Sequence, residues 1–152
     1  MPGYFDTVFA ELAPKDDLQD VTDVSVALFA TADSDLLPAY DPHQATLALV
    51  LTHMDSTTCN TVDGVTFAVQ GHPEAIVHYM APTWPADKSE VKGASAAAPY
   101  VFITGLHGGS SVSVAGTKAG CWVNAGHSGQ TGLFELVDGA VTIGRVMIEE
   151  VD

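Results

Sequence analysis

Positive charge is scarce in this chain. Only 5 of its 152 residues are Lys or Arg, against 19 Asp or Glu, which gives a formal net charge of −14. Contact with nucleic-acid phosphates needs clustered cations, so the composition argues against nucleic-acid binding. The same charge repels anionic membrane surfaces. We therefore expect neither nucleic acid nor membrane among the partners of this protein.

Long hydrophobic runs and targeting segments are also lacking. No apolar stretch reaches the ~18–20 residues of a membrane span, and the first residues do not resemble a signal peptide. The chain is 47% apolar and 16% charged, which excludes intrinsic disorder and favours a packed core. Cysteine is limited to Cys59 and Cys121. Without a secretory signal, both cysteines are expected to be reduced.

The chain is rich in the alternating pattern of β-strands. Short alternating or β-branched segments recur along it, separated by Gly, Pro, Asp, Ser and Thr, as turns require. The predicted strands cover residues 24–29, 47–52, 65–70, 76–80, 100–104 and 111–114. Strands at this spacing without intervening amphipathic helices predict a mainly β fold, an antiparallel β-sandwich or barrel.

The last two predicted strands carry the clearest turn signal. Residues 133–137 and 140–148 flank Asp138-Gly139. Asp-Gly is a favoured pair for a two-residue turn between antiparallel strands. The sequence therefore predicts a β-hairpin at this point.

The N-terminal segment, residues 1–20, is distinct from the rest. Apolar side chains at Phe5, Val8, Phe9 and Leu12 follow helical spacing, so we expect a short N-terminal helix or an arm that docks on a neighbouring chain. Residues 21–152 are predicted to form one β-rich domain.

A Pro- and Ala-rich stretch at 82–99 interrupts the β pattern with three prolines and no alternation. A loop of this length is usually functional or disordered. Trp84 lies between two prolines and can serve as a rigid aromatic anchor. With Trp84, the candidate interface residues are Tyr4, Phe5 and Phe9. The alternative for each is packing in the core of its own chain.

Metal and cofactor chemistry has little support in the sequence. The chain has six histidines, but none are spaced as on a metal-binding helix, and no HExxH or CxxC motif is present. The glycine-rich stretch at 106–111 resembles a phosphate or oxyanion loop, although a hairpin tip explains it equally well. We expect no metal ion and no cofactor.

An enzymatic alternative rests on Cys121. Nucleophilic cysteines need an imidazole within hydrogen-bond reach, and His127 or His107 is the candidate partner. The Gly120-Cys121-Trp122 sequence is similar to that of papain-like hydrolases and loosely to that of bacterial toxin deamidases. Residues 122–126, however, are predicted as strand and turn, where papain-like enzymes begin a helix. The other interpretation of Cys121 is a buried structural residue.

The C-terminal forty residues carry a family resemblance. It rests on a small-residue turn with a Gly-x-Trp-Val strand at 114–126, on Leu-Phe-Glu-Leu at 133–136, and on Ile-Gly-Arg-Val-Met-Ile at 143–148. This order resembles the β-domain of tailed-bacteriophage capsid decoration (cement) proteins.

The resemblance implies a non-enzymatic virion protein on the capsid surface, assembled in the host cytoplasm. Its implied partners are the major capsid protein and other copies of itself, often as a trimer. Another phage structural subunit, such as a tail-tube, connector or fibre protein, is the alternative within this class.

Overall fold

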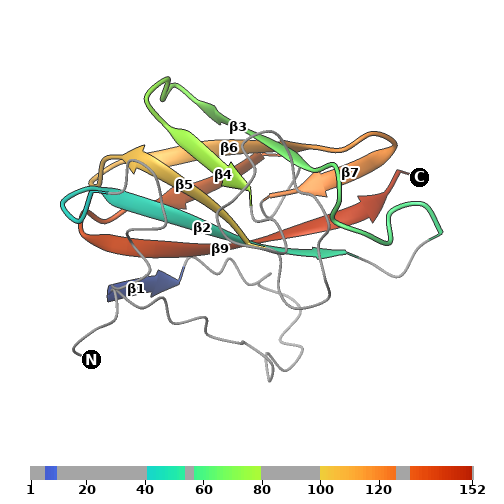
Figure 1. Ribbon diagram of the computed structural model, residues 1–152, viewed down its shortest axis with the longest axis horizontal. Helices are drawn as coiled ribbons and strands as arrows, with labels where there is room; N and C mark the ends of the chain where they lie inside the picture. Colours follow the sequence, from blue (N-terminus) through green and yellow to red (C-terminus); the bar gives the residue numbers. More distant parts are fainter. Residues whose placement is uncertain (1–5, 10–40, 54–56, 80–99, 126–130, 152) are drawn as a thin grey trace.

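The computed structural model describes residues 6–9, 41–53, 57–79, 100–125 and 131–151. These residues form strands joined by turns (Figure 1). The strands are β1 (Asp6–Phe9), β2 (Ala45–His53), β3 (Thr66–Gln70), β4 (Ile76–Tyr79), β5 (Tyr100–Leu106), β6 (Ser111–Thr117), β7 (Cys121–Asn124), β8 (Thr131–Glu135) and β9 (Ala140–Glu150). The predicted mainly β fold is confirmed. Within the described ranges, no helix is long and apolar enough to cross a membrane.

The strands form two sheets that pack face to face. The large sheet has the order β1-β9-β2-β5-β4, with β7 also paired to β9, and it curls into a half-barrel. The small sheet has the order β3-β6-β8. Most pairs are antiparallel, as predicted, but β9 runs parallel to both β1 and β2. The large sheet is therefore mixed rather than purely antiparallel.

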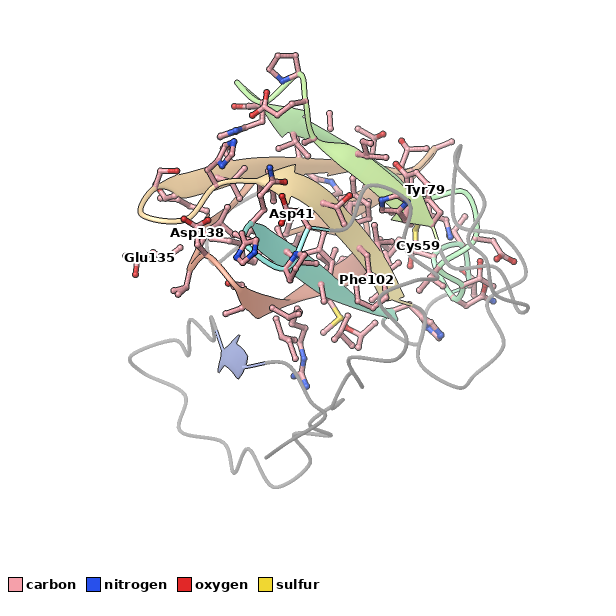
Figure 2. All side chains as sticks on the ribbon, turned by 60° about the vertical axis from the view of Figure 1, so that its left-hand side comes forward. Asp41, Cys59, Tyr79, Phe102, Glu135 and Asp138 are labelled. Atoms are coloured by element: carbon pink, nitrogen blue, oxygen red, sulfur yellow. A yellow bond between two sulfur atoms is a disulfide. The ribbon has the colours of Figure 1, made fainter. Side chains whose placement is uncertain are left out.

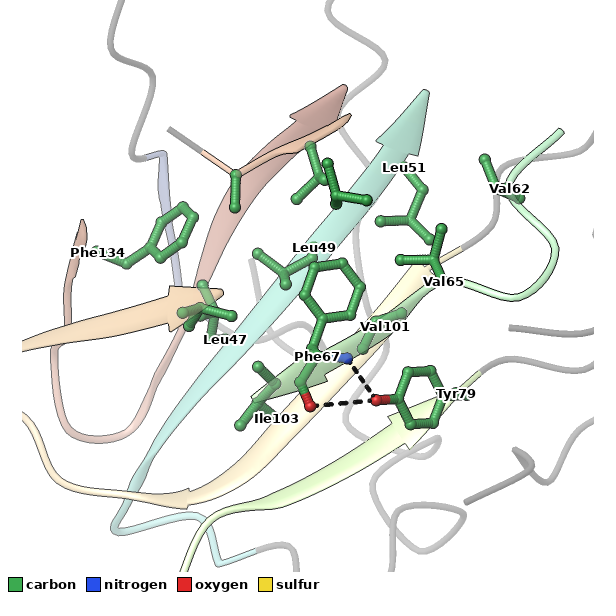
Figure 3. Packing of buried hydrophobic residues seen from close by; sticks show 14 of the residues in the cluster. Leu47, Leu49, Leu51, Val62, Val65, Phe67, Tyr79, Val101, Ile103 and Phe134 are labelled. Carbon is green, nitrogen blue, oxygen red and sulfur yellow. Dashed lines mark hydrogen bonds between the residues drawn. The ribbon is translucent and has the colours of Figure 1, made fainter. Parts of the chain in front are cut away.

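The core lies between the two sheets. Alternate residues of β6 and β7 are buried and point into it, as expected for strands with one face on the core, whereas β2 is buried on both faces. Figure 3 shows the packing of Leu47, Leu49, Val101 and Ile103 from the large sheet against Phe67 and Phe134 from the small sheet. The Phe134 ring lies over Gly144 of β9, where a Cβ atom would overlap it. This glycine lets an aromatic ring approach the large sheet closely.

The predicted hairpin at Asp138-Gly139 is wrong. The turn itself is present, with the Ala140 amide donating to the Val137 carbonyl at 3.2 Å. However, β8 pairs with β6 in the small sheet, whereas β9 pairs with β2 in the large sheet. The turn therefore connects two layers of the sandwich, and the Phe134 ring of β8 packs across the core onto Gly144 of β9.

Of the predicted N-terminal segment, residues 1–20, the structure describes four residues. Residues 6–9 form β1, which pairs in parallel with residues 140–143 of β9. They are therefore strand and not helix. The other residues of the 1–20 segment, the predicted strand at 24–29 and the loop at 82–99 lie outside the described residues.

Candidate functional site

The two cysteines form a disulfide. The sulfurs of Cys59 and Cys121 are bonded, with 5.9 Å between the Cα atoms (Figure 2). The expectation of reduced cysteines is therefore wrong. The two cysteines are 62 residues apart in the sequence, so local sequence patterns do not predict that they meet. In the fold, β6 and the turn after it bring Cys121 beside the loop that contains Cys59. Both side chains are buried.

The disulfide bears directly on the hydrolase alternative. A cysteine nucleophile acts as a thiolate, and the Cys121 sulfur is bonded to another sulfur. His107 is exposed in the loop before β6, while Cys121 follows the turn after β6. The length of that strand separates them, roughly 20 Å at the usual rise per residue. His127 lies outside the described residues.

The loop around Cys59 is held to its neighbours by further contacts. The Lys118 ammonium donates to the Thr61 carbonyl and lies 3.2 Å from the Thr61 hydroxyl. Partial burial lowers the pKa of Lys118. The Thr58 hydroxyl donates to a Glu150 carboxylate oxygen at 2.5 Å. These side chains therefore fasten a loop to the ends of β6 and β9.

The glycine-rich stretch at 106–111 does not form a hairpin tip, because β5 and β6 belong to different sheets. The Gly108 amide donates to Asp138 Oδ1 at 2.6 Å, and the Gly109 amide donates to the Leu136 carbonyl at 3.0 Å. A Cβ on Gly108 would overlap Asp138. A phosphate or oxyanion loop would direct such amides at its ligand. Here the Gly108 and Gly109 amides are instead hydrogen-bonded to the segment that joins β8 and β9.

The described histidines are dispersed. His72 lies 3.0 Å from a Glu74 carboxylate oxygen, on the β3–β4 connection. The pKa of Glu74 is lowered by a backbone hydrogen bond and then by His72. His78 is buried and bonds to the Thr104 hydroxyl at 2.9 Å. Within the described ranges, no three His, Cys, Asp or Glu side chains gather as a metal site would need.

The outer face of the small sheet is the most distinctive surface of the described residues. The side chains that alternate with buried Phe67, Val112, Val114 and Phe134 point outward. They are small or uncharged, apart from Glu135 at one end. We call the uncharged part the neutral face; it consists of Thr66, Ala68, Gln70, Ser111, Ser113, Ala115, Thr117 and Leu133.

Hydrogen bonds order the polar groups of the neutral face. The hydroxyls of Thr66 and Thr117, which lie opposite each other on β3 and β6, are 2.7 Å apart. The Ser113 hydroxyl donates to Gln70 Oε1 at 3.4 Å. The one large apolar side chain of the face is Leu133, which is 60% exposed. Such a surface suits hydrogen bonding and apolar contact with a partner rather than ion pairing.

The predicted interface residues are not part of this surface as described. Phe9 is the last residue of β1, where its backbone pairs with Ile143. Tyr4, Phe5 and Trp84 lie outside the described residues. Leu133 is not among the predicted interface residues, although the sequence carries a signal for it. Adjacent Leu133 and Phe134 in one strand must point to opposite sides, so one of them leaves the core.

Comparison of the chain with protein-family models, with curated proteins and with solved structures gives no match in any of the three.

Proposed function

We propose that this chain is a structural subunit of a larger assembly, which it stabilises by adhesion. The assembly implied by the resemblance of residues 114–148 is a tailed-phage capsid, on which the chain would serve as a decoration subunit. The observation that carries the proposal is the neutral face, an ordered and uncharged sheet surface on a chain of net charge −14.

The charge distribution supports adhesion at this face. Acidic side chains repel other copies and other acidic proteins. The neutral face presents hydroxyl, methyl and amide groups, with Glu135 at its margin. Contact there involves little charge repulsion or charge desolvation. Association at this face therefore avoids much of the repulsion that the acidic side chains of the chain impose.

The chain is proposed to act by binding, without catalysis. A subunit that binds the assembled shell, but not free shell protein, shifts the equilibrium toward the assembled state by mass action. The rigid sandwich keeps the bound surface ordered, so little conformational entropy is lost on binding. Bridging adjacent capsid subunits would raise the temperature at which the shell opens.

The test uses shells built from the major capsid protein of the same virus and lacking the decoration subunit. The wild-type chain is expected to co-sediment with these shells and raise their opening temperature in calorimetry. Ala115→Arg places a charge at the centre of the neutral face and should weaken binding at least about tenfold, since an unpaired charge is costly to bury.

Val151→Arg is the matched control. It makes the same charge change at a half-exposed residue outside the neutral face, and it should bind shells as the wild type does. Failure of the wild-type chain to bind or stabilise the shells would overturn the proposal. Equal binding by the Ala115→Arg variant would exclude the neutral face as the contact.

A further inference from the structure

We propose that β8 pairs antiparallel with β8 of a second copy, about a two-fold axis at Leu133. This inference rests on the proposed function and names a partner for the same sheet. Pairing would join two small sheets into one continuous sheet and double the neutral face. The argument depends on the backbone of β8, on the opposite edge of the small sheet and on the position of Glu135.

The backbone groups of β8 alternate between its neighbour β6 and the open edge. The Leu136 amide donates to the Ser110 carbonyl at 3.2 Å. Because hydrogen-bonded positions recur every second residue in an antiparallel pair, Phe134 and Gly132 also bond toward β6. The amide and carbonyl of Leu133 therefore point away from β6. No other described strand pairs with this edge.

The opposite edge of the small sheet is already occupied. The Tyr79 hydroxyl, from β4, accepts a hydrogen bond from the Phe67 amide at 2.7 Å and lies 3.3 Å from the Phe67 carbonyl oxygen (Figure 3). The Phe67 amide and carbonyl thus face Tyr79 rather than β6. A further strand could not bond to Phe67 without displacing Tyr79, so of the two described edges of the small sheet we assign the pairing to β8.

One contact locates the centre of the open edge. The Thr142 hydroxyl donates to the Glu135 carbonyl at 3.1 Å, and therefore covers the C-terminal end of β8. Leu133 is two residues away, and its side chain is 60% exposed. A two-fold axis at Leu133 pairs this residue with itself, and two amide–carbonyl hydrogen bonds form between edge-facing groups.

The charge of Glu135 selects the antiparallel orientation. In the two-fold arrangement, Glu135 lies opposite Thr131 of the other copy. A parallel arrangement in register would place Glu135 opposite its own counterpart, and like charges directly opposite each other are destabilising. The strand contains no Lys, Pro or bulge, three of the features that protect open edges, and its register with β6 is regular.

The test is sedimentation equilibrium of the full chain. We expect the wild type to form dimers whose dissociation constant falls as salt rises, because salt screens repulsion between acidic copies. Leu133→Lys places two like charges together at the axis and should raise the dissociation constant at least about tenfold. Circular dichroism would check that the variant remains folded.

Val151→Lys is the matched control, with the same charge change at a half-exposed apolar residue outside the neutral face. It should dimerise as the wild type does. As an independent readout, the Leu133 amide should exchange with solvent more slowly at dimer-forming than at monomer concentrations. A wild type that is monomeric or trimeric, or a Leu133→Lys variant that still dimerises, would overturn the inference. Shell binding by such a protein would leave the proposed function standing.

Discussion

At the scale of single residues, the Tyr79 hydroxyl joins the two sheets at one margin of the sandwich. It is buried, and both of its hydrogen bonds go to the Phe67 backbone. An unpaired buried amide is costly, so this side chain satisfies a backbone group that β6 cannot reach. Burial raises the pKa of Tyr79, and the hydrogen bond to Phe67 acts in the opposite direction.

Tyr79→Phe is expected to lower the free energy of unfolding by about 1–3 kcal/mol at neutral pH, because the Phe67 amide loses its partner. The free energy of unfolding of the variant should also depend less on pH in the alkaline range. The folded-state pKa of Tyr79 lies above its unfolded value of about 10, so its contribution is complete below that pH and is lost as pH rises through the folded-state pKa.

Urea denaturation of both proteins from neutral to strongly alkaline pH measures these effects. The difference in unfolding free energy between wild type and variant isolates Tyr79 from the other tyrosines. That difference should shrink as pH rises beyond about 10. Equal stability at neutral pH would contradict the role assigned to this hydroxyl.

At the scale of elements, β9 organises the large sheet. Residues 141–148 pair with β2 on one side, while β1 and β7 pair with the two ends of the other side. The disulfide adds a covalent link between β7 and the loop before β3. The short strand β7 is thus held both by hydrogen bonds to β9 and by Cys121.

Replacing both Cys59 and Cys121 with Ala should lower the free energy of unfolding by about 2–4 kcal/mol. The disulfide closes a loop of 62 residues, and this closure restricts the unfolded chain, which loses conformational entropy that the variant regains. Urea denaturation of the oxidised wild type and of the variant measures the loss.

The control for this prediction is the wild type treated with a reductant, which should approach the variant in stability. Thiol titration of the denatured, unreduced wild type should find no reactive thiol. Two titratable thiols in that sample would contradict the disulfide itself.

At the scale of the whole molecule, charge is the dominant feature. The net charge of −14 follows from 5 cationic and 19 anionic residues. Crowding this charge into a compact fold costs free energy through self-repulsion. The 5 cationic side chains are far fewer than the 19 carboxylates, so local pairing can offset only part of the repulsion.

Salt should stabilise the fold. Raising ionic strength from about 10 mM to about 150 mM shortens the screening length from about 30 Å to about 8 Å and weakens this repulsion. We expect the thermal unfolding midpoint to rise over this range, as measured by circular dichroism. Low protein concentration keeps association from contributing. A midpoint that falls with salt would show that attractive charge pairs dominate.

The fold class and most strand positions can be predicted from the sequence alone. Alternation is a local property with a period of two residues, so it is visible without any partner strand. It placed strands at 47–52, 65–70 and 76–80, close to β2, β3 and β4. The same alternation required adjacent Leu133 and Phe134 to face opposite sides, which was the available clue to the candidate site.

Strand pairing, and the exposure of surfaces among the described residues, depend on contacts between distant parts of the chain. The Asp138-Gly139 turn is compatible with a hairpin or with a crossing between sheets, and packing of Phe134 against Gly144 accompanies the crossing. The Cys59–Cys121 contact and the closure of the β3 edge by Tyr79 likewise join residues distant in sequence. Such contacts depend on the path of the whole chain, because periodicity records which way a side chain points and not what it meets.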